Sequence, residues 1–164
     1  MNLTETPERV TWPESHYVFI EKIGPFQETA PAAWQTLHQH IPGIAENNKI
    51  TEYFSLYKMP ANIYRAGVAV AEKPAKLPEG LAYEKFPGGD YSRFTLTGPY
   101  SDLPGASRRV FQIVSEKQIP LRDDYCIEHY VKDPRTTPAE QLVTEILVPG
   151  LPKKFENTLK ADPK

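Results

Sequence analysis

The sequence predicts an α+β protein of two strand-helix-strand-strand units related by a pseudo-two-fold axis, with two helices packed on an antiparallel sheet and a central groove. A motif repeats: "GPF" at 24–26 returns 74 residues later as "GPY" at 98–100. Each copy follows a strand-like run and precedes a helix-like one. At the same offset further residues match, namely Ala32 and Ala106, Lys58 and Lys132, Pro60 and Pro134, with Leu37 opposite Phe111. Matches in register with one element order favour an internal duplication.

The first unit is expected over residues 15–72. A strand is predicted where β-branched and aromatic residues gather in "HYVFIEKI". The helix that follows is expected to be capped by Thr29 or Ala30, because Pro31 suits a first turn. Its apolar stripe consists of Ala33, Trp34, Leu37 and Ile41. The expected elements are a strand at 16–23, a helix at 27–41, and strands at 51–59 and 64–71, with a turn at Pro60 and Asn62 between the last two.

The second unit is expected over residues 88–150 and repeats the first. Gly88-Gly89 predicts a turn into its first strand, since a phosphate loop would need a strand before it and a helix after it. Ser101 is expected to cap the helix. The apolar face of that helix consists of Leu103, Ala106, Val110, Ile113 and Val114. The expected strands are 90–97, 125–133 and 141–149.

Composition narrows the class of protein. The 164 residues suit one domain over 15–150, with an N-terminal extension at 1–14 and a polar tail at 151–164 that would fray or form a short helix. A net charge of −2 argues against nucleic-acid binding. No apolar run approaches ~18 residues, so no membrane span is expected, and residues 1–15 do not resemble a signal peptide. Cys126 is the single cysteine, which excludes an intramolecular disulfide and suits a reducing cytoplasm.

Glu128 is the most informative charged residue, because it lies in the middle of the strand "YCIEHYV". Strand alternation puts it on one face with Cys126 and Tyr130, and at the 74-residue offset it corresponds to Phe54. Burial of an unpaired carboxylate costs several kcal/mol, so this one should be paired, protonated or ready for a cationic ligand. The alternative is an exposed edge strand or a salt bridge with Lys58, Lys132 or Arg65.

Other candidate site residues give weaker indications of function. The four histidines, His16, His38, His40 and His129, show no metal-ligand spacing and are expected to be solvated, and no cofactor motif is present. Glu145 could act as a second carboxylate beside Glu128, or it could face solvent. Trp34 and Phe111 are either core residues or the lining of a groove.

The chain resembles the GyrI-like small-molecule-binding domain, which also serves as the effector-binding module of AraC- and MerR-type regulators. The resemblance covers about 15–150 and is carried by "VFIEKIGPFQETAPAAWQTLHQHI", "YRAGVAVAE", "FPGGDYSRFTLTGPYSDL" and "YCIEHYVKDPRTTPAEQLVTEILVPG". It implies the same two-unit fold and a pocket for cationic or aromatic drugs, with the family's pocket glutamate at Glu128. One departure is "YRAGVAV", where the family often has an acidic residue at the position of Gly67.

A site of this kind holds an organic cation by charge, cation–π attraction and apolar burial. Its expected walls are Tyr130, Tyr57, Trp34 and Phe111, with Phe54 and Cys126 nearby.

Three functions stay open for a copy without a helix-turn-helix. The first is a binding protein for amphipathic, cationic aromatic compounds. The second, implied by the resemblance, is a hydrolase of cyclopropanoid natural products with Glu128 as general base and Tyr130 or Tyr57 orienting the substrate. The third is a protein partner, as in the gyrase-inhibiting members.

Overall fold

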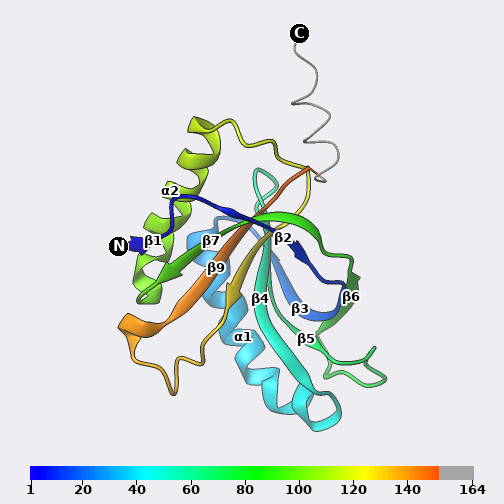
Figure 1. The fold of residues 1–164 in the computed structure, drawn as a ribbon. Coiled ribbons are helices and arrows are strands. Elements are labelled where there is room, and N and C mark those ends of the chain that lie inside the picture. Colours follow the sequence, from blue (N-terminus) through cyan, green and yellow to red (C-terminus); the bar gives the residue numbers. More distant parts are fainter. Residues whose placement is uncertain (152–164) are drawn as a thin grey trace.

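The strands of the chain form one antiparallel sheet, which carries both helices on one face (Figure 1). The computed structural model describes residues 1–151. Its strands are β1 (Asn2–Leu3), β2 (Glu8–Trp12), β3 (Ser15–Ile23), β4 (Ile50–Lys58), β5 (Ile63–Val70), β6 (Ala82–Phe86), β7 (Gly89–Thr97), β8 (Cys126–Tyr130) and β9 (Val143–Pro149). The α-helices are α1 (Phe26–Asn47) and α2 (Leu103–Glu116), and the 3₁₀ turns are η1 (Tyr100–Asp102) and η2 (Ala139–Gln141). The tail predicted at 151–164 lies outside the described residues except for Leu151.

The order of strands across the sheet is β1-β7-β9-β8-β4-β5-β3-β6, and β2 also pairs with β7. Both segments run strand-helix-strand-strand, as β3-α1-β4-β5 and as β7-α2-β8-β9. They meet at the ladder between β4 and β8, which we call the seam. The architecture is therefore the predicted α+β fold. A common origin of the two segments by duplication remains an inference from sequence.

Residues 1–14 are not a mere extension of the fold. Strand β2 pairs with β7 over five residues, from Glu8 opposite Arg93 to Trp12 opposite Gly89. Strand β6 pairs with β3 in the same way on the other half. Each half of the sheet is thus completed by the strand that precedes the other half in sequence. These strands were missed because 8–12 and 82–86 are short and lack a marked apolar alternation.

Helix α1 begins earlier than its predicted cap, whereas α2 begins two residues after Ser101. Helix α1 starts at Phe26, so Thr29 lies in its first turn, where its hydroxyl donates to the carbonyl of Pro25 at 3.2 Å. It also continues past Ile41 because Ile44, fully buried, extends the apolar stripe to Asn47. Ser101 lies in η1 and makes no capping hydrogen bond to α2.

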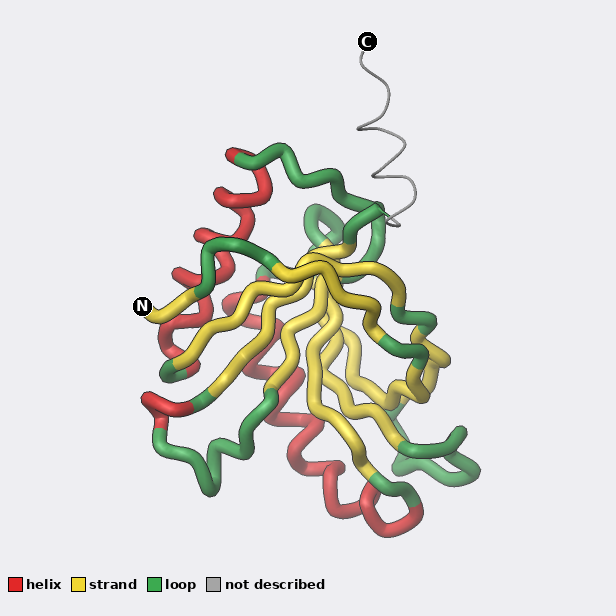
Figure 2. The backbone as a smooth tube through the Cα atoms, in the orientation of Figure 1, coloured by secondary structure: helices red, strands yellow, loops and turns green. Residues whose placement is uncertain are grey.

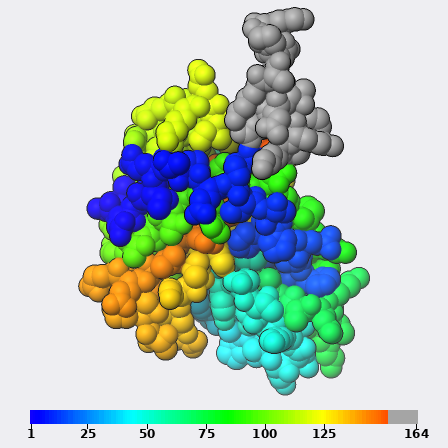
Figure 3. Space-filling view, viewed as in Figure 1, coloured from blue at the N-terminus to red at the C-terminus, as the bar shows by residue number. Residues whose placement is uncertain are grey.

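Two apolar clusters lie on opposite faces of the sheet. The larger one fills the space between the sheet and both helices, with Leu37 and Val110 among its helical members and Val68 and Ile146 among its strand members. The tube in Figure 2 shows α1 passing behind the strands. The smaller cluster consists of Tyr17, Phe19, Phe54, Leu56, Ala69, Phe86, Tyr91, Ile127 and Leu147. Val10 and Trp12 of β2 pack against the smaller cluster, and the N-terminal residues run across the front of the molecule in Figure 3.

None of the helices within residues 1–151 is long and apolar enough to cross a bilayer.

Candidate functional site

Glu128 lies at the seam, directly opposite Ser55 of β4. The two residues also occupy corresponding positions in their segments. Gly24 and Gly98 both have φ of 143°, a conformation that favours glycine, and they donate to the carbonyls of Asn62 and Leu142 respectively. The pseudo-two-fold axis can be located by following the ladders from these two glycines.

From Gly24 the ladders lead through the pairs Ile23–Ile63 and Ile63–Lys58. From Gly98 they lead through the pair Thr97–Val143, and Val143 accepts a hydrogen bond from Val131. Lys58 therefore corresponds to Val131, and three residues earlier Ser55 corresponds to Glu128. The axis passes between Ser55 and Glu128, so the seam carries a hydroxyl on one side and a carboxylate on the other. The predicted counterpart, Phe54, was wrong by one residue, and a one-residue slip moves a side chain to the other face.

A chain of hydrogen bonds leads from α1 to the Glu128 carboxylate. The Tyr130 hydroxyl donates to Glu128 Oε1 at 2.5 Å and lies 3.0 Å from Ser55 Oγ. Ser55 Oγ lies 2.7 Å from the Tyr64 hydroxyl, and Trp34 Nε1 donates to that hydroxyl at 2.8 Å and to Ser55 Oγ at 3.1 Å. These side chains come from α1, β4, β5 and β8, so both halves of the molecule contribute.

The ends of this chain fix the direction of every hydrogen bond in it. An indole nitrogen can only donate, and an ionised carboxylate can only accept. Tyr130 must then donate to Glu128, Ser55 to Tyr130, and Tyr64 to Ser55. All donors point toward Glu128, and aligned donors of this kind stabilise a negative charge. Among residues 1–151 the second carboxylate oxygen, Oε2, receives no hydrogen bond.

Aromatic rings pack against the tyrosines of this hydrogen-bonded chain. Trp34 and Tyr100 each pack edge-on against Tyr130, with ring centroids 5.2 and 5.7 Å apart. Deeper in the same face, Tyr57 stacks on Tyr64 at 6.5 Å, and both are buried. Phe26 of α1 contacts both of them. Aromatic side chains of α1, β4, β5 and η1 thus cluster along the hydrogen-bonded chain that ends at Glu128.

The electrostatics of the site follow from its burial. Burial raises the pKa of Glu128, and the hydrogen bond from Tyr130 offsets part of that effect. Burial and the charge of Glu128 raise the pKa of Tyr64 to about 12. Burial also raises the pKa values of Tyr130 and Tyr57 well above 10. The phenols therefore stay neutral and serve as donors, while Glu128 carries the ionisable charge.

The predicted residues divide between two faces. Trp34, Tyr57, Cys126 and Tyr130 lie on the helix-covered side of the sheet together with Glu128. Cys126 is buried opposite Tyr57, and burial raises the pKa of its thiol to about 12, so it acts as an apolar neighbour. Phe111 of α2 packs against the larger cluster, but no ring or polar contact joins it to Glu128.

Phe54 does not line this site. It is fully buried in the smaller cluster, stacked on Tyr17 at 4.6 Å on the other face of the sheet. The same is true of the position where the family often has an acidic residue, because Gly67 pairs with Phe54. A Cβ at Gly67 would lie 2.4 Å from Cζ of Tyr17, so only glycine admits that ring. The absence of an acidic residue at position 67 therefore does not change the charge at the Glu128 site, which lies on the other face of the sheet.

The salt bridges to Lys58, Lys132 or Arg65 that were the alternative for Glu128 are not formed. Arg65 binds Glu21 and Glu84, and Lys58 lies over the ring of Tyr125. Within residues 1–151 no lysine or arginine forms an ion pair with Glu128. Glu145 does not join Glu128 either, because it faces the opposite side of the sheet.

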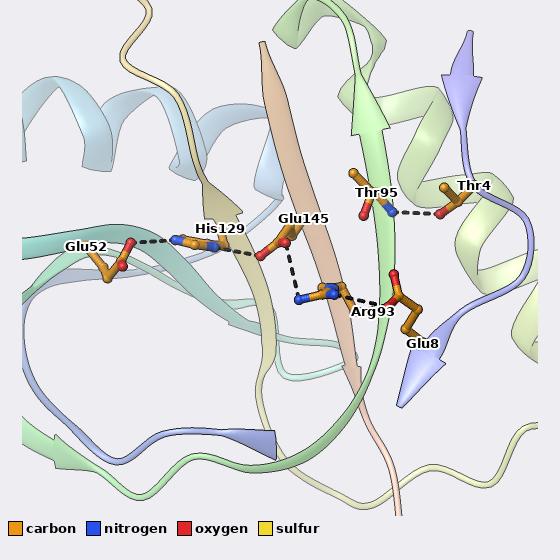
Figure 4. A network of polar contacts seen from close by, with 7 residues as sticks. All are labelled: Thr4, Glu8, Glu52, Arg93, Thr95, His129 and Glu145. Carbon is orange, nitrogen blue, oxygen red and sulfur yellow. Dashed lines mark hydrogen bonds and ion pairs between the residues drawn. The ribbon is translucent and has the colours of Figure 1, made fainter. Parts of the chain in front are cut away.

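On that opposite face, His129 lies between two carboxylates, which the prediction of solvated histidines missed. Its Nδ1 is 2.8 Å from Glu145 Oε1 and its Nε2 is 2.7 Å from Glu52 Oε2. Figure 4 shows the network continuing from Glu145 to Arg93 and from there to Glu8 of β2. The only sequence signal was the alternation that put His129 opposite to Glu128. Its partners come from two other strands.

These acidic and imidazole groups do not form a metal site. In the part of the chain that the structure describes, no group of three or more His, Cys, Asp or Glu side chains could hold a metal ion.

Solved structures share this fold at low sequence identity. The C-terminal domain of EcmrR has a TM-score of 0.70 at 19% identity, covering 91% of this chain and 98% of that one. SAV2435 bound to tetraphenylphosphonium has a TM-score of 0.69 at 15% identity, covering 87% and 92%. A hydrolase from Listeria innocua has a TM-score of 0.57 at 13% identity, covering 89% and 92%.

Among curated proteins no sequence matches the chain. The family model of the GyrI-like small molecule binding domain, in contrast, matches residues 5–150, which include β2 and both halves of the sheet. The chain therefore belongs to the GyrI-like small-molecule-binding domain family.

Proposed function

We propose that the chain binds amphipathic aromatic cations at the seam, with Glu128 as the counter-ion. The observation that carries the proposal is the geometry of its carboxylate. One oxygen is held by Tyr130, the other has no donor among the described residues, and the Tyr130 ring packs against the rings of Trp34 and Tyr100. A partly desolvated carboxylate attracts a cation more strongly than it would in water, and ring faces add cation–π attraction.

The donor chain supports this role. Because Trp34, Tyr64, Ser55 and Tyr130 all donate in the direction of Glu128, the carboxylate can stay ionised despite its burial. A diffuse cation that approaches Oε2 neutralises the charge without needing that chain to break. Tetraphenylphosphonium, the ligand bound to the structural neighbour SAV2435, is a suitable probe of this chemistry.

The test compares wild type with Glu128→Gln, which keeps the shape of the side chain and removes its charge. Removal of one partner from a desolvated charge pair costs roughly 2–5 kcal/mol, so tetraphenylphosphonium affinity measured by calorimetry should fall at least about tenfold. Neutral triphenylphosphine oxide should lose much less. The matched control is Glu140→Gln, an exposed glutamate in η2. Equal affinity of Glu128→Gln and wild type for the cation would contradict the proposal.

A second candidate is hydrolysis of strained electrophiles such as cyclopropanoid natural products. The Tyr130–Glu128 hydrogen bond favours it, because Glu128 Oε2 remains available as a general base toward water while Tyr130 holds the carboxylate. The hydrolase from Listeria innocua with the same fold supports testing it. Mass spectrometry of such compounds after incubation should reveal a product heavier by one water, formed by wild type and not by Glu128→Gln. Unchanged substrate would exclude this activity for the compounds tried.

Two partner classes remain predictions from sequence. The net charge of −2 supports the expectation that the chain itself does not bind nucleic acid, and a gel shift with duplex DNA at physiological salt tests it. A protein partner is implied by the family resemblance.

A further inference from the structure

A surface hollow lies on the face of the sheet opposite to Glu128. Its volume is about 360 Å³, at the lower end of the range for small-molecule sites. Its floor contains Phe54 and Ala69 of the smaller apolar cluster, and Trp12 of β2 forms a wall. The rest of the lining comes from the connection between β2 and β3 and from the neighbouring ends of β4 and β5. The hollow thus lies where the connection from β2 to β3 passes the first residues of β4 and the last of β5.

The Trp12 wall is held in place by ring contacts. Its indole packs edge-on against Phe54 with ring centroids 5.3 Å apart, and against His129 at 5.0 Å. Its Nε1 and the hydroxyl of Ser15 are buried and have no hydrogen-bond partner among residues 1–151. Unpartnered buried donors are uncommon and costly in native folds. Two of them beside one hollow leave hydrogen-bonding capacity unused there.

The rim of the hollow is acidic. Glu52 Oε2 accepts a hydrogen bond from His129, which is held in turn by Glu145, and this contact orients the Glu52 side chain. Glu52 Oε1 receives no hydrogen bond within the described chain. Glu14 is the second rim carboxylate and lies 3.3 Å from Lys85. The one basic group of the lining, His16, is engaged by the Tyr83 hydroxyl at 2.8 Å.

We propose that this hollow is a second binding site, which takes a small aromatic ammonium ion independently of Glu128. The aromatic ring packs on Trp12 over the apolar floor, and the ammonium group binds the free oxygen of Glu52. The rim carboxylates disfavour anions. Glu52 is the binding residue, and His129 is a positioning residue that orients it.

The two tryptophans of the chain make the sites distinguishable in one experiment, because Trp12 lies at the hollow and Trp34 at the seam. In a ¹⁵N-labelled sample each gives one indole N–H signal, and Trp12→Phe assigns them. Titration with benzylammonium chloride should shift the Trp12 signal saturably. Benzyl alcohol, which is similar in shape and uncharged, should shift it more weakly. A shift confined to Trp34, or no saturable shift of either signal, would overturn the proposal.

Three variants then locate the binding. Glu52→Gln should weaken benzylammonium binding by about two- to fivefold, since Glu52 is half exposed and exposed ion pairs are modest. Ala71→Phe adds a ring at the rim and should abolish the Trp12 shift. Glu128→Gln should leave the benzylammonium titration unchanged, and so should the control Glu140→Gln. A separate site would be contradicted if Ala71→Phe bound benzylammonium as tightly as wild type. It would also be contradicted if Glu128→Gln lost as much benzylammonium affinity as Glu52→Gln.

Discussion

His129 is expected to act as a proton-dependent clamp across the seam, and the change that tests this is His129→Gln. Both ring nitrogens of His129 face carboxylate oxygens, of Glu145 at 2.8 Å and Glu52 at 2.7 Å. A carboxylate can only accept, and a neutral imidazole has one N–H donor, so both contacts are hydrogen bonds only when the ring is an imidazolium. Burial alone would lower the pKa of His129, but the hydrogen bonds to Glu145 and Glu52 outweigh it and the pKa is raised.

The magnitude follows from the exposure of the three side chains. His129 is 12% exposed and Glu145 18%, so their charge-assisted bond should contribute about 1.5–2 kcal/mol. Glu52 is 51% exposed, and its bond should contribute less than about 1 kcal/mol. His129→Gln should therefore destabilise the fold by about 2 kcal/mol near pH 6. For a chain of this size that corresponds to a fall in Tm of roughly 4–8 °C.

The pH dependence has a definite sign. A raised pKa in the folded state gives stability that is fully present below the unfolded value of about 6.5 and is lost as the pH rises through the folded value. The His129 bond lowers the pKa of Glu145, which adds stability above about 4.5 that is lost as the pH falls through the lowered value. The clamp should thus be strongest between about pH 4.5 and pH 6.5, should weaken as the pH rises through the raised pKa of His129, and should be weaker at pH 9.

Urea unfolding of wild type and His129→Gln at pH 6 and pH 9 measures the effect. The difference between the two proteins should shrink to about 1 kcal/mol or less at pH 9, where one hydrogen bond is lost in wild type as well. A double-mutant cycle with Glu145→Gln isolates the stronger contact. A difference that is equal at both pH values would refute the imidazolium assignment.

Three further substitutions or treatments have defined outcomes. Gly67→Ala should cost about 3 kcal/mol in urea unfolding, because the new Cβ meets the ring of Tyr17 at 2.4 Å, whereas the control Gly105→Ala has only ordinary contacts and should be neutral or stabilising; equal midpoints would contradict this. Ser55→Ala should cost about 1–3 kcal/mol because Trp34, Tyr64 and Tyr130 each lose one hydrogen bond. A destabilisation no larger than that of an exposed Ser→Ala substitution would argue against the hydrogen-bonded chain. Cys126 should resist thiol reagents in the native state at pH 8, since a pKa of about 12 leaves roughly one thiolate in ten thousand, and should react readily in denaturant; rapid native labelling would show that it is accessible.

Features that depend on local sequence patterns could be predicted from the sequence. Period-two alternation put Glu128 with Cys126 and Tyr130 on one face, and His129 on the other. Turn residues and apolar stripes predicted the order of the two helices and of β3, β4, β5, β7, β8 and β9, including the Gly-Pro motif that precedes each helix. These properties depend on neighbours within a few residues, so they can be derived without knowledge of the fold.

The tertiary structure decided everything that depends on register between distant strands. The equal spacing of the two Gly-Pro motifs predicted Phe54 as the counterpart of Glu128, but the ladders make it Ser55. A shift of one residue reverses the face of a side chain, and sequence spacing cannot fix it when the connections differ in length. For the same reason the carboxylates beside His129, and Tyr64 beside Trp34, became visible only in the structure. Their energies come from contacts that the folded sheet alone brings within hydrogen-bond distance.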